Sequence, residues 1–141
     1  MAERICKKKL EDSGRSDIGV SSASILDMEG TPGDPVAARI LNEEGFDGDN
    51  HRSRLLTDDM VNDADRIIVM ERRHKTEILA RHGRDNVDHK IFLLKPYTDG
   101  CYQSDDIEAS DIADPYRLSH YHYRLCFAEI YLAVEGLLRC I

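Results

Sequence analysis

The sequence predicts an α/β fold, an open, doubly wound parallel sheet with helices on both faces. Two runs carry this prediction, 66–70 (Arg-Ile-Ile-Val-Met) and 90–94 (Lys-Ile-Phe-Leu-Leu), because neither shows the alternation of a half-exposed strand. Segments with helical periodicity lie between and after these runs, as crossover connections between parallel strands do. The 141 residues show no change of composition along the chain, so we expect a single domain over 1–141.

The first half of the chain predicts two helices and one strand. A helix is expected over 1–12, and a strand over 18–22, where a short β-rich stretch follows turn-forming residues. A second helix is expected over 36–44. Asp34 can cap its first turn, with a proline directly after it, and Gly45 can end it.

The second half adds a short helix that starts at Thr57 and a longer one over about 73–82. A polar loop over roughly 95–114 follows the second apolar run, and we expect Asp111 in this loop to face solvent. The last helix is expected to begin at Pro115 and to run almost to the end of the chain. Its apolar residues recur at spacings of three and four and form one stripe, made of Leu118, Tyr121, Leu125, Ala128 and Leu132.

Composition excludes some classes of partner. The net charge of −8 and the pI of about 5.2 disfavour nucleic acid as a partner, since phosphates need a basic footprint. No apolar run approaches the roughly 20 residues that span a bilayer, so no membrane partner is expected. The basic triplet at 7–9 is followed by charged residues and not by an apolar stretch, so we expect a cytoplasmic protein.

The four cysteines are widely scattered and form no C-x-x-C pair. Reduced thiols are therefore expected, without a disulfide or a zinc site. Cys126 lies on an apolar helix face, where we expect it to serve packing. His120 and His122 form an H-x-H pair, but that spacing on a helix points the two rings apart, so we expect no metal and no cofactor.

Several short stretches occur in an order that resembles one known family. They are Met1-Ala-Glu3, Val20-Ser-Ser-Ala23, Gly30-x-Pro32 with Asp34-Pro35, Gly45 with His51-x-Ser53-Arg54, Ala64-Asp65 with Ile68-Val-Met70, and Asp111-Ile-Ala-Asp-Pro-Tyr116. Together they resemble the low-molecular-weight protein tyrosine phosphatases, whose fold is shared by thioredoxin-coupled arsenate reductases. The resemblance covers nearly the whole chain.

The resemblance implies a phosphocysteine mechanism. In the family, an initial strand runs into a phosphate-binding loop of Cys, five residues and Arg, which leads into a helix. The Cys thiolate attacks phosphorus, and the Arg and the loop amides hold the phosphoryl oxygens. An Asp from a DPY-type loop protonates the leaving phenol. The implied substrate is a phosphotyrosine protein or a small aryl phosphate.

Four residues match functional positions of that family. Asp114 matches the general acid, although an Asp-Pro pair also commonly caps a helix. Tyr116 matches a residue that flanks the phosphotyrosine ring, with core packing as the alternative. Ser22 and His51 match residues that support the phosphate loop, with a strand-end hydroxyl and an exposed loop histidine as the alternatives. Arg54 could contact an anion, but a solvated surface position is the preferred interpretation.

One part of the family pattern has no counterpart in residues 1–141. Met1-Ala-Glu3 matches the middle of the first helix segment, so the strand and the Cys-x5-Arg loop would lie upstream. Cys6 cannot replace the nucleophile, because Glu11 and Asp12 follow it at the distance where the Arg would stand. The sequence therefore predicts an N-terminally truncated phosphatase domain, with the first strand missing and without activity as it stands.

Other interpretations stay open. A start codon assigned at an internal Met would produce this chain from a complete phosphatase, and a non-catalytic binding or regulatory module is the alternative. Arsenate reduction ranks lower, because no two of Cys101, Cys126 and Cys140 are expected to form a close pair. The missing family strand would lie between the strands ending near Ser22 and Met70. Its absence would leave backbone groups unpaired, so self-association is expected.

Overall fold

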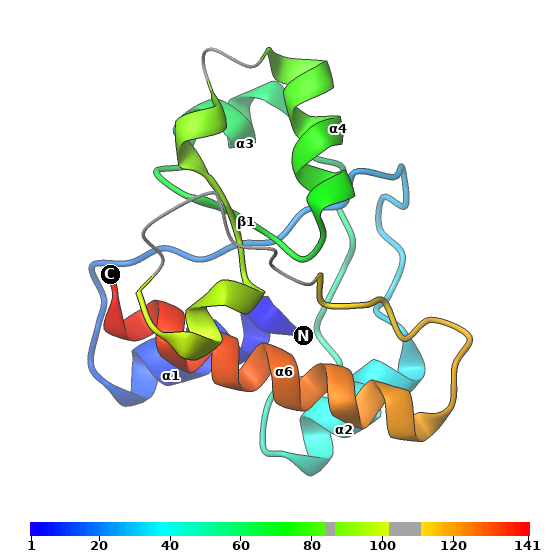
Figure 1. The fold of residues 1–141 in the computed structure, drawn as a ribbon. Helices are drawn as coiled ribbons and strands as arrows, with labels where there is room; N and C mark the ends of the chain where they lie inside the picture. The colour runs from blue at the N-terminus through cyan, green and yellow to red at the C-terminus, as the bar shows by residue number, and fades with distance from the viewer. Residues whose placement is uncertain (84–86, 102–110) are drawn as a thin grey trace.

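The computed structural model describes residues 1–83, 87–101 and 111–141. The elements are α1 (Ala2–Asp12), α2 (Pro35–Glu43), α3 (Asp58–Asp63), β1 (Ile67–Val69), α4 (Arg72–His82), η1 (Asp88–Lys90), β2 (Ile91–Leu93), η2 (Lys95–Asp99) and α6 (His120–Arg139). Figure 1 shows α1, α2 and α6 on one side of β1, and α3 and α4 on the other. The expected α/β fold is therefore confirmed. The central part of the expected 95–114 loop lies outside the described residues.

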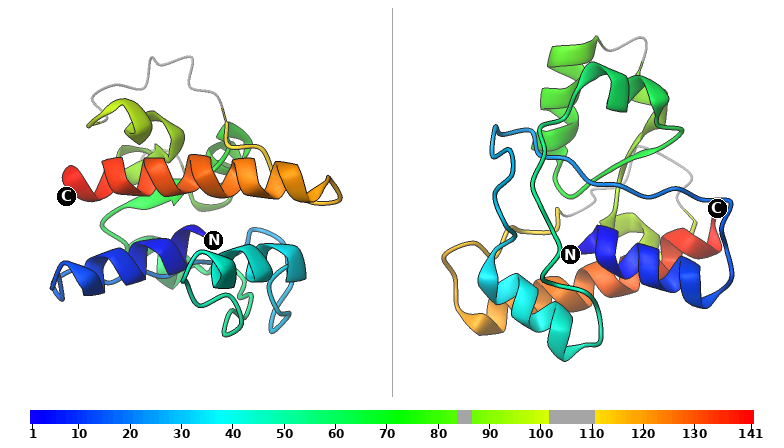
Figure 2. Two further views of the ribbon diagram at one scale, coloured as in Figure 1. Left: turned by 90° about the horizontal axis from the view of Figure 1, so that it is seen from below. Right: turned by 180° about the vertical axis from the view of Figure 1, so that it is seen from behind.

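The two strands are parallel, and their neighbouring apolar residues pack on opposite faces. Ile67, Ile68 and Val69 pair with Ile91, Phe92 and Leu93. Val69 and Leu93 pack in the core under α3 and α4, whereas Ile68 and Phe92 pack against the core formed with α1, α2 and α6. This arrangement explains why the two runs are apolar without alternation. Figure 2 shows α1 and α2 one after the other along the length of α6.

The helix starts that have local signals match the expectations. Asp34 Oδ1 accepts hydrogen bonds from the backbone N–H groups of Val36 (2.8 Å) and Ala37 (3.1 Å), with Pro35 in the first turn of α2. Thr57 caps α3 through its side chain. These caps are formed by residues within a few positions of the helix start, which is why the sequence predicts them.

The strand expected over 18–22 does not form. Ile18 and Val20 pack against the core and Gly19 is exposed, so the segment keeps the alternation of a strand. In the described part of the chain, no backbone hydrogen bond joins residues 18–22 to a neighbouring strand, and the nearest ladder contact is the isolated bridge between Ser24 and Leu55. Composition favours an extended backbone here, but a strand also needs a partner that pairs with it.

The last helix differs from the expectation in its start and in its buried face. It begins at His120, because Leu118 N–H donates to Pro115 O (2.9 Å) in a preceding turn that contains Arg117 at φ 65°. The expected stripe faces solvent, with Leu118, Tyr121, Leu125 and Leu132 between 47% and 66% exposed. The opposite face is buried through Tyr123, Cys126, Phe127, Ile130, Ala133, Val134 and Leu137. Because α6 is apolar on two opposite sides, periodicity alone cannot say which side packs.

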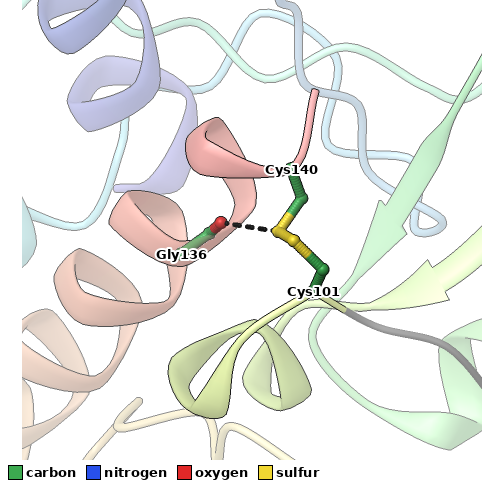
Figure 3. Close-up of a disulfide and its surroundings, with 3 residues drawn as sticks. All are labelled: Cys101, Gly136 and Cys140. Atoms are coloured by element: carbon green, nitrogen blue, oxygen red, sulfur yellow. Dashed lines mark hydrogen bonds between the residues drawn. A yellow bond between two sulfur atoms is a disulfide. The ribbon is translucent and has the colours of Figure 1, made fainter.

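The expectation of four reduced thiols is wrong for one pair. Cys101 and Cys140 form a disulfide that joins the end of η2 to the end of α6 (Figure 3). Cys6 and Cys126 are free and buried, which confirms the packing role of Cys126. The partners are 39 positions apart, and they meet because η2 packs directly on α6. At this contact a Cβ on Gly136 would lie 1.8 Å from Tyr97 O, so only glycine fits.

Candidate functional site

The first turn of α1 borders a polar cavity. Met1 caps α1 without a side-chain hydrogen bond, so backbone N–H groups at this end are unpaired within the helix and give it partial positive charge. A cavity of about 220 Å³ adjoins this turn. Its lining residues are Glu3, Arg4, Ser22, Asn50, His51, Arg52 and Arg54. Three arginines and a helix N-terminus around one cavity can attract an anion.

Glu3 links two of the sequence-predicted site residues. Its carboxylate accepts hydrogen bonds from Ser22 Oγ and from Lys7 Nζ (2.5 Å), and His51 Nδ1 lies 4.0 Å from Glu3 Oε2. Burial opposes ionisation of Glu3, but the hydrogen bonds from Lys7 and Ser22 outweigh it and lower the pKa of this carboxyl. The structure therefore brings Ser22 and His51 together around an ionised Glu3. The sequence analysis missed this role, although a glutamate in the first turn of a helix is a usable signal.

His51 and Arg54 lie deeper than expected. The His51 side chain is 34% exposed, and burial lowers the pKa of its imidazole, which keeps the ring neutral at pH 7. Arg54 is half-buried and its Nε donates to Ser22 O (3.0 Å). The solvated position expected for Arg54 is therefore wrong. The contact escapes sequence reasoning because it joins residues 32 positions apart.

The loop that carries Asp114 is anchored at the carboxyl end of β1. Ile112 N–H donates to Met70 O (2.9 Å), and Asp111 Oδ1 accepts from the backbone N–H of Arg72 (2.9 Å) at the start of α4. Asp111 is thus half-buried and does not simply face solvent as expected. Ligands of open parallel sheets bind beyond the carboxyl ends of the strands, and this loop lies there.

Asp114 and Tyr116 are both exposed. Asp114 Oδ1 accepts from Tyr116 N–H (3.0 Å), so it closes a local turn and does not cap the last helix, whose cap residue is Ser119. The Tyr116 side chain is 59% exposed, which excludes the core-packing alternative. The guanidinium of Arg117 lies 5.2 Å from the centre of the Tyr116 ring.

Asp114 and the start of α1 act on the same buried thiol. Burial raises the pKa of Cys126 to about 11, and the Glu129 carboxylate adds to this rise. The Met1 ammonium opposes the rise, and Asp114 adds the smallest contribution. Within the described residues, no hydrogen bond joins Asp114 or Tyr116 to Ser22 or His51. The structure thus groups the predicted residues as two pairs, Ser22 with His51 and Asp114 with Tyr116.

Metal binding and membrane crossing find no support in the described residues. No group of three or more His, Cys, Asp or Glu side chains in that part of the chain is arranged to hold a metal ion. None of the helices described there has both the length and the apolar composition that crossing a bilayer requires.

The fold and these two pairs of residues agree with one class of protein, the small α/β phosphatases. Residues 1–141 match the family model described as "Low molecular weight phosphotyrosine protein phosphatase", and the chain belongs to this family. A relative from Ralstonia solanacearum, named as a probable low molecular weight protein-tyrosine-phosphatase EpsP, is 33% identical over 119 residues, which cover 84% of this chain and 74% of the relative. A relative of the same name from Ralstonia nicotianae is 35% identical over 100 residues, 71% of this chain, which span only 61% of that protein's length.

Solved structures agree with this assignment. The tyrosine phosphatase amsI of Erwinia amylovora is 27% identical, with a TM-score of 0.81 over 98% of this chain and 81% of that one. The arginine phosphatase YwlE, solved as a mutant with a phosphorylated active-site serine, is also 27% identical, with a TM-score of 0.83 over 98% and 84%. Vibrio vulnificus Wzb, solved with benzylphosphonate, is 26% identical, with a TM-score of 0.79 over 98% and 86%.

Proposed function

We propose that residues 1–141 form the general-acid and loop-supporting part of a phosphotyrosine phosphatase active site. Asp114 is the general acid, Tyr116 flanks the substrate ring, and Ser22 and His51 support the phosphate loop. The observation that carries this proposal is the meeting of Ser22 and His51 at the first turn of α1. The family resemblance selected Ser22 and His51 separately, and they are 29 positions apart. In the structure they line the same cavity, at a helix end that attracts anions.

The chemistry divides between this part and the phosphate loop. In the first step a thiolate displaces the phenol from phosphorus, and the Asp114 carboxyl gives its proton to the departing phenolate oxygen. Asp114 then takes a proton from the water that hydrolyses the phosphocysteine. Residues 1–141 contain no Cys-x5-Arg sequence, so we propose that they do not turn over substrate by themselves.

The proposed substrate is a phosphotyrosine protein or a small aryl phosphate. The exposed Tyr116 ring supports an aromatic substrate, since it offers a stacking surface beside Asp114. The names of the relatives and the benzylphosphonate complex of Wzb agree with this choice. A structural neighbour named as an arginine phosphatase has the same fold. The fold therefore does not identify the substrate, and the choice of an aryl phosphate is argued from the residues of the site.

A loop-bearing chimera tests the proposal. It joins residues 1–141 to the N-terminal segment of a characterised family member, which runs from the first strand through the Cys-x5-Arg loop to the helix residues that precede the position of Met1. We expect no hydrolysis of 4-nitrophenyl phosphate by residues 1–141, and hydrolysis by the chimera that is lost when the loop Cys is replaced by Ser. A folded chimera without turnover would favour the alternative, a non-catalytic binding or regulatory module.

Arsenate reduction remains a weaker alternative. The expectation that no two of the three later cysteines form a close pair is wrong, because Cys101 and Cys140 are bonded. That pair lies at the far end of α1, where Arg15 Nη1 donates to Ile141 O (3.2 Å). An 11-residue helix is about 16 Å long, too far for a direct disulfide relay to the first turn of α1.

We also propose self-association and a cytoplasmic location. Within the described ranges the 18–22 segment has no strand partner, and this segment and the exposed apolar stripe of α6 support self-association. Sedimentation velocity of residues 1–141 tests it. A reducing cytoplasm keeps most cysteine pairs as thiols. Thiol trapping in cells therefore tests the location, because a fully oxidised Cys101–Cys140 pair would contradict it.

A further inference from the structure

The turn that follows Asp114 holds a side chain in an unfavourable backbone conformation. Leu118 N–H donates to Pro115 O (2.9 Å), and Arg117 takes the third position of this four-residue turn at φ 65°. Among the described residues, Arg117 is the one non-glycine residue with positive φ. Glycine usually fills such a position, because a side chain there costs free energy. Backbone strain of this kind gathers at ligand-binding sites, which makes the Arg117 side chain a candidate for contact with a ligand.

The guanidinium of Arg117 lies beside the ring that we propose to flank the substrate. It is 5.2 Å from the centre of the Tyr116 ring, which is within the range of a cation–π contact. Both residues are exposed. A substrate ring that stacks on Tyr116 therefore brings its neighbouring groups close to this cation.

Arg117 differs from the arginines of the neighbouring helices in its ion pairing. Each arginine of α4 and α6 pairs with a carboxylate, and Arg124 Nη1, for example, lies 3.0 Å from Glu43 Oε2. Within the ranges 1–83, 87–101 and 111–141, no carboxylate forms an ion pair with the Arg117 guanidinium. Its planar fork of N–H donors matches the two oxygens of a carboxylate, so an acidic ligand fits it.

The charge of the whole chain gives this cation more influence on an acidic ligand. The net charge is −8, and Asp114 places a further carboxylate two positions before Tyr116. Both repel a negatively charged peptide. A cation beside the substrate ring offsets this repulsion locally, because charges act over a Debye length of about 8 Å at physiological ionic strength.

We infer that Arg117 is a specificity-determining residue, which selects peptides with a glutamate or aspartate next to the phosphotyrosine. The inference deepens the proposed function and rests on Tyr116 as the residue that flanks the substrate ring. Tyr116 contacts the ring, and the Arg117 guanidinium donates hydrogen bonds to the adjoining carboxylate of the peptide. Complementary charges of this kind contribute to the choice between substrates.

Paired peptides test the inference in the loop-bearing chimera. One peptide carries Glu on both sides of the phosphotyrosine and the other carries Gln, so the two differ in charge and hardly in shape. We expect kcat/KM to be about three- to fivefold higher for the Glu peptide, as an exposed ion pair allows, and NaCl at about 0.5 M should reduce this ratio. Arg117→Gln should lower the ratio to about 1, whereas Arg117→Lys should keep part of it.

Arg124→Gln is the matched control, because Arg124 is also exposed but is already paired with Glu43 and Glu44. It should keep the ratio of the unchanged chimera. Each ratio compares two substrates in one protein, so a loss of folded protein does not alter it. An unchanged ratio in Arg117→Gln would overturn the inference, as would an equal fall in Arg124→Gln, which would indicate an effect of net charge alone.

Binding separates a failure of this inference from a failure of the proposed function. If the chimera hydrolyses neither peptide, the proposed function fails. Fluorescence anisotropy with the chimera whose loop Cys is replaced by Ser then measures peptide affinity without turnover. We expect tighter binding of the Glu peptide, and loss of this difference in Arg117→Gln. Equal affinities for the two peptides, or no measurable binding, would contradict the inference.

Discussion

The disulfide offers a prediction whose size follows from the structure. Replacing Cys101 and Cys140 together by Ser removes a bond that closes a loop of 39 residues. Loop-closure entropy for that length is about 13 cal/mol/K, which corresponds to about 4 kcal/mol of stability at 25 °C. Unfolding entropy of about 2.1 cal/mol/K per residue over the 141-residue chain converts this loss into a fall of roughly 13 °C in Tm.

Calorimetry with and without dithiothreitol measures this loss. The oxidised wild type should unfold roughly 13 °C above both the reduced wild type and the double variant, and the reductant should not change the variant further. Denatured, unreduced protein should show two reactive thiols, those of Cys6 and Cys126. Four reactive thiols in the denatured, unreduced protein would refute the reasoning, and so would a wild-type Tm that does not change when dithiothreitol is added.

Three further predictions concern the fold and its pH dependence. Gly136→Ala should lower the free energy of unfolding, measured in urea, by more than about 2 kcal/mol, because the new Cβ overlaps Tyr97 O. In an ordinary helix interior the same change would raise stability by about 1 kcal/mol. Asp34→Ala should cost about 1–2 kcal/mol through the lost cap of α2, and Asp34→Asn should recover most of it. The free energy of unfolding should fall as pH drops below 6.5, because the unfolded chain protonates His51 more readily than the folded protein does. It should fall again as pH drops below 4.5, because the unfolded chain also protonates Glu3 more readily than the folded protein does. Urea midpoints from pH 8 to pH 3 measure both steps, and His51→Asn should remove the upper one.

Local signals predicted local structure well. The caps at Asp34 and Thr57 use atoms within three residues of the helix start, so the sequence contains all the information that they need. The apolar runs that became β1 and β2 were predictable for a related reason. A strand covered on both faces shows its environment in its own composition.

Features that depend on a distant partner could not be predicted in the same way. The 18–22 segment has the composition of a strand but no strand pairs with it among the described residues. The Cys101–Cys140 bond joins residues that meet only because η2 packs on α6. For α6, two apolar faces compete, and only packing against α1, α2 and η2 decides between them.

The candidate site divides along the same line. The family resemblance supplied Ser22, His51, Asp114 and Tyr116, yet the contacts that organise them come from elsewhere in the fold. Glu3 joins the first pair across 19 and 48 positions of sequence, and both contacts need α1 to lie beside those loops. Such contacts become visible only when the chain is folded.

The central claim is that Asp114 acts as a general acid in a phosphotyrosine phosphatase site completed by a Cys-x5-Arg loop. The most direct test compares the loop-bearing chimera with its Asp114→Asn variant on phenyl phosphate at pH 5–7. We expect a fall in kcat of about 10²–10⁴-fold, with a much smaller fall for 2,4-dinitrophenyl phosphate. Equal rates for the chimera and the variant on phenyl phosphate would contradict the claim.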